Sequence, residues 1–398
     1  MTRSSSGRDP IAIGPLLAAS LAALLVTSAA SAQEVKIKLG TVAPQGSTWH
    51  ELLKEMAAQW KEASGGKVDL KIYAGGTQGS EGEMVKKLNI GQLHAASITV
   101  VGLRDITPEP QAIGCPGVLD TEEEYDYVIS KMRGELEQVI LAKGYVVLNW
   151  AEAGFVKIFS KTPRTKLDEY KKGKIFAWNG DPDAEEAWKR AGLRPVLLAS
   201  TDLIPSLQTN MVDIVTEPPL YAYTSGFYEK AKYMLDLNWG FLNGATVVKR
   251  DQWEKIPADI RPKLLAIAEA TGRKVQAEVR SKVKESMDQM KAKGLVVLQP
   301  ENLPEWKHAL AQVQSVVRGK VVSAATFDRV IALRDEFRAA KAAGTTPGAA
   351  AAPSPAPAPD APPAAAGEKH AGSGSSGSAA HHKKGSGSKH KKAAGSTE

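Results

Sequence analysis

The stretch that decides the fold runs from Tyr170 to Tyr221 and reads YKKGKIFAWNGDPDAEEAWKRAGLRPVLLASTDLIPSLQTNMVDIVTEPPLY. It contains three short apolar runs with the length and composition of buried strands: Lys174–Trp178, Leu193–Ala199 and Met211–Val215. A helix is predicted in each interval. Asp181-Pro182 favours the start of the first helix, Thr201 or Asp202 can cap the second, and Asn210 can end it in the left-handed conformation.

The resulting order is strand, helix, strand, helix, strand, which predicts parallel strands joined by right-handed crossovers. In α/β sheets of this kind a ligand lies at the carboxyl ends of the strands. Two of those ends carry Phe176–Asn179 and Thr216–Tyr221, and the second includes Glu217 followed by two prolines. We therefore expect a ligand site where these two ends meet.

Segments inside and outside this stretch share a pattern with a known family. Inside it the similar text is KKGKIF, AGLRPVLL and TDLIPSLQTNMVDIVTEPP. Outside it the similar text is LGTVAPQGSTWHELLKEMAAQWKEASGGKVDLKIYAGGTQGSEGEMVKKLNIGQLHAASIT and KRDQWEKIPADIRPKLLAIAEATG. Over roughly residues 35–335 the chain resembles the solute-binding proteins of TRAP (tripartite ATP-independent periplasmic) transporters.

The resemblance implies a fold class and a role. The fold would be α/β, a two-lobed periplasmic binding protein of the type II-like kind, with hinge strands and a long helix that spans both lobes. The role would be that of a receptor that closes on one small-molecule ligand and delivers it to TRAP membrane subunits. Neither an enzyme reaction nor a cofactor is implied.

Three positions depart from the family pattern. Phe176 stands where the family's ligand-clamping Arg follows its G-k-k-i text, Val156 stands where a second Arg is common, and Glu217 replaces an Asn. Lys157 follows Val156, so in a strand it points to the opposite face. A guanidinium grips a carboxylate by two parallel hydrogen bonds, which an aromatic ring cannot do. The sequence therefore favours a mainly apolar or neutral ligand. The alternative is an ordinary organic-acid receptor that uses a different cation.

The chain divides into predicted parts. Residues 1–32 have the charged start, the apolar run and the small-residue cleavage site of a secretory signal peptide, which predicts a periplasmic location. A retained membrane anchor is the alternative. Lobe 1 is expected over 33–150, with 243–270 returning to it, and lobe 2 over 151–242 with 271–340. Residues 344–398, rich in Ala and Pro and then in Gly, Ser, His and Lys, are expected to be a disordered tail.

Periodicity and capping residues predict the remaining elements. Strands are expected over 35–39, 68–73, 95–100, 145–150, 154–160 and 239–248. Helices are expected after the cap Ser47, over 81–89 and 122–142, from about 259 to 293, and over 306–337. The helix near 259–293 would be about 50 Å long, enough to cross both lobes. Gly272 near its middle is either a flex point or a tolerated surface residue.

The candidate ligand-binding residues are aromatic or polar residues at predicted strand or loop ends: Phe176, Trp178, Asn179, Glu217, Tyr221, Trp49, Tyr73, Trp150, Phe155 and Trp239. Phe176 and Trp178 share one face of a strand, so they form either a pocket wall or a patch of core. Asn179 either bonds the ligand or makes a turn. Glu217 is either a buried carboxyl with a raised pKa or a solvated loop residue. Tyr221 is a candidate for hinge packing, and Trp49 for helix core.

Several other chemistries are not predicted. Cys115 is the only cysteine, so no intrachain disulfide is expected, and its apolar surroundings predict a buried thiol. His50 and His94 have no partner at metal-ligand spacing. There is no P-loop, nucleophile elbow or zinc-protease motif. The net charge is +7, but the tail after Gly344 holds six lysines against three acidic residues, so no nucleic-acid surface is predicted.

Two further possibilities stay open from the sequence alone. The tail motifs HHKK and KHKK have the composition to bind a metal or a polyanion, and a merely solvated tail is the alternative. The other possibility concerns the role of the whole chain. Two alternatives to the receptor role remain. One is a ligand-binding or tethering protein of the envelope that needs no transporter, and the other is an envelope enzyme that uses Glu217 as acid or base.

Overall fold

The computed structural model describes residues 34–179, 182–199 and 202–345. Within them nine strands form one sheet of order β2-β1-β3-β8-β4-β7-β5-β6, and β9 pairs with β8. The strands are β1 (Val35–Thr41), β2 (Val68–Tyr73), β3 (Ala95–Thr99), β4 (Tyr145–Ser160), β5 (Ile175–Trp178), β6 (Pro195–Leu198), β7 (Ile214–Glu217), β8 (Tyr233–Lys249) and β9 (Val296–Leu298). The predicted signal peptide lies outside the described residues, as does the predicted tail beyond Thr345.

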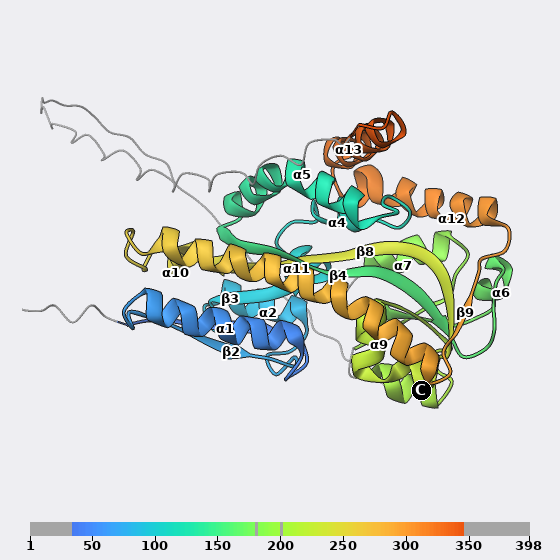
Figure 1. Ribbon diagram of the computed structural model, residues 1–398, viewed down its shortest axis with the longest axis horizontal. Helices are drawn as coiled ribbons and strands as arrows, with labels where there is room; N and C mark the ends of the chain where they lie inside the picture. Colours follow the sequence, from blue (N-terminus) through green and yellow to red (C-terminus); the bar gives the residue numbers. More distant parts are fainter. Residues whose placement is uncertain (1–33, 180–181, 200–201, 346–398) are drawn as a thin grey trace, which may run out of the picture. The chain divides into compact units, whose positions relative to one another are not determined.

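Helices lie on both faces of the sheet (Figure 1). The longer ones are α1 (Thr48–Ala63), α2 (Glu81–Asn89), α5 (Glu122–Ala142), α7 (Pro182–Arg190), α11 (Arg261–Ala292), α12 (Leu303–Val316) and α13 (Ala324–Ala342). The shorter ones are α3 (Val100–Leu103), α4 (Gln111–Gly114), α6 (Leu167–Lys171), α8 (Leu203–Gln208), α9 (Pro219–Ser225), η2 (Phe227–Glu229), α10 (Arg250–Trp253) and η3 (Val317–Val321).

Capping residues place several helices where the sequence predicts them. The Ser47 hydroxyl accepts a hydrogen bond from the His50 N–H at the start of α1. Ser80 and Glu83 form a reciprocal capping box at the start of α2, which satisfies free N–H groups of the first turn. Thr121 caps α5. The predicted helices over 81–89 and 122–142 are confirmed with these bounds.

The decisive stretch forms β5, α7, β6, α8 and β7, and β5 pairs in parallel with both β6 and β7. Asn210 follows α8 in the left-handed conformation, with φ of 58°. Two details of the prediction are wrong. β7 begins at Ile214 instead of Met211, because the N–H groups of Met211 and Val212 still bond to Ser206 in the turn that ends α8. Asp202 makes no side-chain cap, and Asp181 and Thr201 lie outside the described residues.

The two strands predicted over 145–150 and 154–160 are one strand, β4, which is a correction. The ladder to β8 continues through the predicted gap with register shifts between Glu152 and Gly154 and at two other places. Gly154 has φ of 91°, a conformation that L side chains rarely adopt, so the glycine carries a local irregularity instead of ending the strand.

The long strands β4 and β8 join the two lobes. β8 pairs with β3 near its carboxyl end, over residues 244–248, and with β9 near its start, over 233–235. In lobe 1, β1 pairs in parallel with β2 and β3; in lobe 2, β5, β6 and β7 are parallel. Figure 1 shows α11 crossing β4, with α1 beside one part of it and α9 beside another. The predicted helix across both lobes is thus confirmed as α11.

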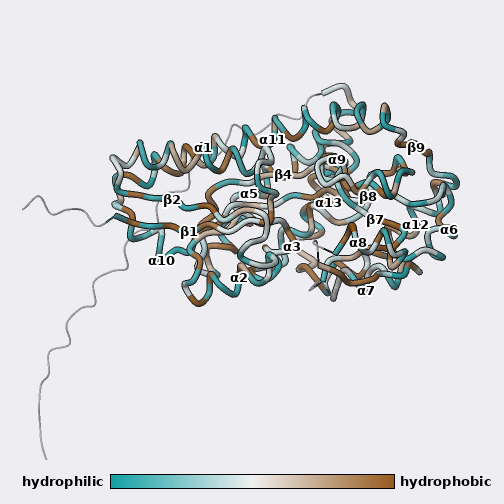
Figure 2. The backbone as a smooth tube through the Cα atoms, turned by 90° about the horizontal axis from the view of Figure 1, so that it is seen from below, coloured by the Kyte–Doolittle hydropathy of each residue, from teal (hydrophilic) through white to brown (hydrophobic). Residues whose placement is uncertain are grey.

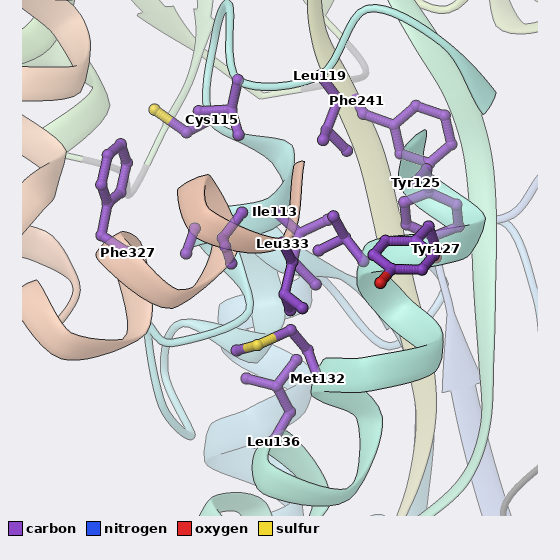
Figure 3. Close-up of a cluster of buried hydrophobic side chains, with 14 of the residues drawn as sticks. Ile113, Cys115, Leu119, Tyr125, Tyr127, Met132, Leu136, Phe241, Phe327 and Leu333 are labelled. Atoms are coloured by element: carbon purple, nitrogen blue, oxygen red, sulfur yellow. The ribbon is translucent and has the colours of Figure 1, made fainter. Parts of the chain in front are cut away.

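One hydrophobic core lies between α5, α13 and the middle of β8 (Figure 3). Tyr125 of α5 stacks on Phe241 of β8 with ring centroids 4.1 Å apart. Cys115 is buried in this cluster, and burial raises the pKa of its thiol. The predicted buried thiol is confirmed.

Two expectations about the C-terminal helices are wrong. Gly272 is neither a flex point nor a surface residue, because it is buried where α11 crosses β4, and an added Cβ would lie 2.7 Å from the Trp150 carbonyl oxygen. The single helix predicted over 306–337 is two helices, α12 and α13. The chain leaves the helical conformation at Arg318 and at Gly319, which has φ of 81°.

Figure 2 shows hydrophilic and hydrophobic residues alternating along the helices, the pattern of helices with one buried side. α1 is typical: its buried residues His50, Leu52, Leu53, Met56 and Trp60 recur at helical spacing. In the part of the chain that the structure describes, no helix combines the length and apolarity needed to cross a membrane.

Candidate functional site

The carboxyl ends of the two sets of parallel strands point toward each other from opposite sides of the β4–β8 pair. β3 ends with Thr99 paired to Gly244, which pairs in turn with Ala151 of β4. β7 ends with Glu217 paired to Lys157 of β4. Along β4 the two ends are therefore separated by the six residue steps from Ala151 to Lys157, roughly 20 Å at about 3.3 Å per residue. Since ligands of α/β sheets bind beyond such ends, this is the candidate ligand site.

Glu217 is a buried carboxyl at the end of β7. It is 3% exposed, and its Oε1 has no hydrogen-bond partner among the described residues. Burial raises the pKa of Glu217 to about 8, and a hydrogen bond from the Trp178 side chain opposes that rise. At neutral pH the carboxyl is therefore mostly protonated in this structure. Of the two alternatives that the sequence leaves open for Glu217, a buried carboxyl or a solvated loop residue, the structure shows the buried carboxyl.

Two aromatic candidates, Trp178 and Tyr221, lie near Glu217, and a third, Phe176, lies against Trp178. Trp178 hydrogen-bonds to Glu217, and Phe176 meets Trp178 edge-on with ring centroids 5.4 Å apart. Burial, and secondly the charge of Glu217, raise the pKa of Tyr221 to about 12. Trp178 and Tyr221 are partly buried, but Phe176 is 1% exposed inside a hydrophobic cluster. In this structure Phe176 is therefore core, the second of the two alternatives that the sequence leaves open, and its contact with a ligand stays a prediction.

Three other aromatic candidates are engaged elsewhere. Trp239 is 4% exposed and stacks on Trp188 of α7, with centroids 4.6 Å apart and planes 7° from parallel. The Trp150 indole donates to Glu137 Oε1 of α5 at 3.0 Å. Phe155 is partly buried edge-on against Phe241 at 4.9 Å. Trp239 and Trp150 are thus held by neighbours inside the fold, and their contact with a ligand stays a prediction.

The remaining candidates lie at strand ends or in the first turn of α1. Trp49 donates its indole N–H to Ser97 Oγ of β3 at 3.0 Å and packs in a cluster with Leu220 of α9, so it lies where the lobes touch. Tyr73, at the end of β2, lies under Lys71 with Nζ 5.3 Å from the ring centroid. Asn179 is exposed, and its N–H bonds to the Leu198 carbonyl.

Sequence reasoning missed an ionic network between the strand ends. Glu152 of β4 is 1% exposed, and Arg280 of α11 donates to it at 2.7 and 2.9 Å. Arg280 also holds Asp126 of α5 at 2.7 and 2.8 Å, and Gln276 bonds to both carboxylates. Burial lowers the pKa of Arg280, but the bonds to Asp126 and Glu152 outweigh it and raise that pKa. The guanidinium thus makes four hydrogen bonds to two carboxylates.

Asn243 was also missed. It lies in β8 opposite Glu152, is 1% exposed, and has no partner for either amide atom among the described residues. α4 packs closely over it, because a Cβ on Gly114 would lie 3.2 Å from Asn243 Oδ1. The available signal was a polar residue inside a short apolar run, Glu152 in WAEAGF and Asn243 in GFLNGA.

A second buried carboxyl lies at the end of β3. Glu81 of α2 accepts hydrogen bonds from the Thr99 N–H at 2.9 Å, the Thr99 hydroxyl at 2.8 Å and the Gly102 N–H at 2.9 Å. Burial raises the pKa of Glu81, and these bonds oppose the rise. The carboxylate thus occupies the N–H groups that an anionic ligand would otherwise find at this strand end.

Two surface hollows lie away from these ends. One, of about 570 Å³, runs along the last turns of α11 from Ser281 to Lys293. The other, of about 270 Å³, lies between α2 and α10 and includes Asn89 and Lys249. Neither includes a candidate residue. In the described ranges, no three His, Cys, Asp or Glu side chains are arranged to hold a metal ion.

A family model described as bacterial extracellular solute-binding protein, family 7 (DctP), matches residues 39–318. Among curated proteins, the C4-dicarboxylate-binding periplasmic protein DctP of Rhodobacter capsulatus is 24% identical over 327 residues. The match covers 78% of this chain and 94% of that protein.

Solved structures share the fold. A TRAP periplasmic solute binding protein from Pseudomonas putida F1 with bound D-glucuronate has a TM-score of 0.68 and 21% identity, covering 75% of this chain and 96% of that one. A TRAP periplasmic solute binding protein from Ralstonia eutropha H16 with bound (S)-2-acetolactate has a TM-score of 0.71 and 17% identity, covering 76% and 99%. The two-lobed α/β architecture predicted from the sequence is thus confirmed.

Proposed function

Because the chain belongs to the bacterial extracellular solute-binding proteins of family 7, we propose that it is an extracytoplasmic receptor that closes on a small solute and delivers it to TRAP membrane subunits. Members of this family are solute receptors, not enzymes. The long strands β4 and β8 and the helix α11 connect both lobes and supply a hinge for closure. A periplasmic location fits the signal-like residues 1–32.

The ligand that we propose is mainly apolar or neutral. The observation that carries this proposal is the buried carboxyl of Glu217, flanked by Trp178 and Tyr221, at the strand end where relatives of the family have an Asn. A carboxylate ligand beside Glu217 would meet either a negative charge or a protonated acid. At the family's Arg position it would meet the ring of Phe176 and not a guanidinium. Arg280, whose guanidinium bonds to Glu152 of β4, is already neutralised by Glu152 and Asp126.

The magnitudes allow such a ligand. Burying about 200 Å² of apolar ligand surface contributes about 5 kcal/mol at ~25 cal/mol per Å². Micromolar affinity requires about 8 kcal/mol. A few hydrogen bonds to neutral partners supply the difference at about 1 kcal/mol each. An ion pair with a guanidinium is not needed.

The second candidate is an organic-acid receptor. The ligands of similar proteins favour it, since one relative is a C4-dicarboxylate-binding protein and two structurally similar proteins hold D-glucuronate and (S)-2-acetolactate. For this chain, that function would require Arg280 to leave two buried or partly buried carboxylates, or a cation from elsewhere to enter the site. Leaving Glu152 buried without a partner is costly, which weighs against this candidate.

A thermal-shift panel separates the two candidates. The panel pairs simple dicarboxylates and sugar acids with apolar and neutral solutes of similar size. Under the proposal, apolar or neutral solutes raise the unfolding temperature and dicarboxylates do not, because a ligand stabilises the state that it binds. Large shifts with dicarboxylates and none with apolar solutes would overturn the proposed ligand class. Mass spectrometry of solutes that co-purify with the protein then identifies the ligand.

A further inference from the structure

The carboxyl of Glu217 lacks a counter-charge. Its pKa is set by burial and by the bond from Trp178, and no cationic side chain of the described residues contributes to it. Its partner in the ladder, Lys157, is bound to Asp236 at 2.7 Å. A buried carboxyl with an unpartnered oxygen destabilises the empty receptor. A ligand group that donates a hydrogen bond to Oε1 removes this cost, and the removal contributes to the binding free energy.

We propose that the ligand carries a small organic cation, an ammonium or a quaternary ammonium group, which is received by Glu217 between the rings of Trp178 and Tyr221. This inference rests on the proposed function and adds one cationic group to a mainly apolar ligand body. Aromatic faces attract cations through the ring quadrupole, most strongly when the cation has lost water. The site combines that attraction with one carboxylate.

The groups that face Glu217 fit a cation better than an anion. On α9 the titratable groups are Tyr221 and Tyr223, and Lys293 of α11 lies 5.8 Å from the Tyr223 centroid, bound over that ring. The α11 residues that pack in the cluster with Glu217's neighbours are Met287 and Met290, which carry no charge. At the facing strand end of lobe 1, Glu81 adds a second carboxyl. Its pKa is set by burial and by bonds from Thr99 and Gly102, and no cationic side chain in the described ranges contributes to it.

The proton balance of binding follows from this assignment. The empty site holds Glu217 mostly as the neutral acid near pH 7, since its pKa is about 8. When the cation enters, the carboxyl proton leaves to solvent and the carboxylate pairs with the ligand charge. Binding therefore releases up to one proton near neutral pH, and affinity rises with pH until Glu217 is ionised in the empty protein.

The experiment uses three probes that share one ring: cyclohexylmethylammonium, cyclohexylmethanol and cyclohexanecarboxylate. Isothermal titration calorimetry of the full chain should show the ammonium binding about tenfold or more tightly than the alcohol, near pH 7. Heats measured in buffers of different ionisation enthalpy should report proton release. Glu217→Gln should abolish the preference for the ammonium while leaving the affinity for the alcohol nearly unchanged. Glu229→Gln, which alters an exposed acid of the same lobe, is the matched control and should change nothing.

Two sets of outcomes overturn the inference, and they have different consequences. If the alcohol binds as tightly as the ammonium, if none of the three binds, or if Glu217→Gln keeps the ammonium preference, the cationic assignment fails and the proposed receptor function stands. If the carboxylate binds most tightly, the proposed ligand class fails as well. If Glu217→Gln folds poorly, the number of protons released when the unaltered protein binds the ammonium tests the assignment instead. Proton uptake, or no proton exchange, would contradict the assignment.

Discussion

Arg280 of α11 holds the buried carboxylate of Glu152 in β4 by two hydrogen bonds, 2.7 Å from Nε to Oε1 and 2.9 Å from Nη2 to Oε2. The same guanidinium holds Asp126 of α5. Glu152 lies beside the register shift of β4, between the strand ends of the two lobes. One side chain thus ties the long helix and α5 to β4.

Arg280→Met should lower the free energy of unfolding by about 3 kcal/mol or more, because it leaves Glu152 buried without a compensating charge. The double variant Glu152→Leu/Arg280→Met should recover much of that loss, since apolar side chains of similar volume remove the buried charge itself. Urea unfolding of both variants measures the two values.

The matched control is Arg318, which makes the same two-bond contact with Asp328 at 2.6 and 2.6 Å, but on the surface. Arg318→Met should leave the free energy of unfolding nearly unchanged, because water screens the exposed pair. Equal losses at Arg280 and Arg318 would show that burial of Glu152 does not govern the energetics of the network.

Gly272→Ala should destabilise the protein by about 1–3 kcal/mol, although alanine is the better helix former. The new Cβ would lie 2.7 Å from the Trp150 carbonyl oxygen and 2.8 Å from the Asn149 Cβ, so α11 would have to move away from β4. Gly134→Ala in α5 is the control, since nothing lies within 4 Å of its Cβ, and it should stabilise by up to about 1 kcal/mol. Thermal unfolding measures both, and stabilisation by both substitutions would contradict the close packing of α11 on β4.

The sequence predicted elements whose signals are local. The capping box at Ser80 and the cap at Thr121 set the starts of α2 and α5, and the predicted bounds of both helices are confirmed. The continuity of β4 was missed because Gly154 resembles a strand break, whereas pairing with β8 holds the strand together through it. The break at Gly319 between α12 and α13 was missed because the apolar pattern runs on across it.

The sequence likewise predicts one part of the candidate site and not the part that depends on tertiary contacts. Glu217, Trp178 and Tyr221 lie close together because β5 and β7 are parallel neighbours whose carboxyl ends lie at one end of the sheet, and topology rules predict that. Arg280 comes from a different part of the chain, 128 residues after Glu152, and no local pattern pairs them. Trp239 gave a local aromatic signal, but its partner Trp188 in α7 is a tertiary contact that the pattern does not contain.

Glu217 should make stability fall as pH rises through the neutral range. Its pKa in the folded protein is about 8, against about 4.3 for an unfolded chain, so between these values the folded state binds more protons. Stability then decreases with pH over this window, by up to about 1.4 kcal/mol per pH unit, and the effect ends once pH passes the folded-state pKa.

Glu217→Gln isolates this effect, because glutamine keeps the shape and cannot ionise. The difference in free energy of unfolding, variant minus unaltered protein, should grow from about pH 5 to about pH 8 and then level off. Urea unfolding at four pH values measures it. A difference that is constant across this range would mean that Glu217 ionises normally in the folded protein.

Asn243 is a buried polar residue whose replacement by an apolar one should cost little stability. Both of its amide atoms are buried without a partner among the described residues, so Asn243→Leu removes two unsatisfied groups and no hydrogen bond. We expect its free energy of unfolding to be unchanged within about 1 kcal/mol, or higher. Asn149→Leu in β4 is the matched control. Asn149 is also buried, but its amide donates to the Ala268 carbonyl of α11 at 2.9 Å, so that substitution should cost about 1–3 kcal/mol. Comparable losses in the two variants, measured by urea unfolding, would show that the Asn243 amide holds a bound water or ligand group, because only a lost partner accounts for such a cost.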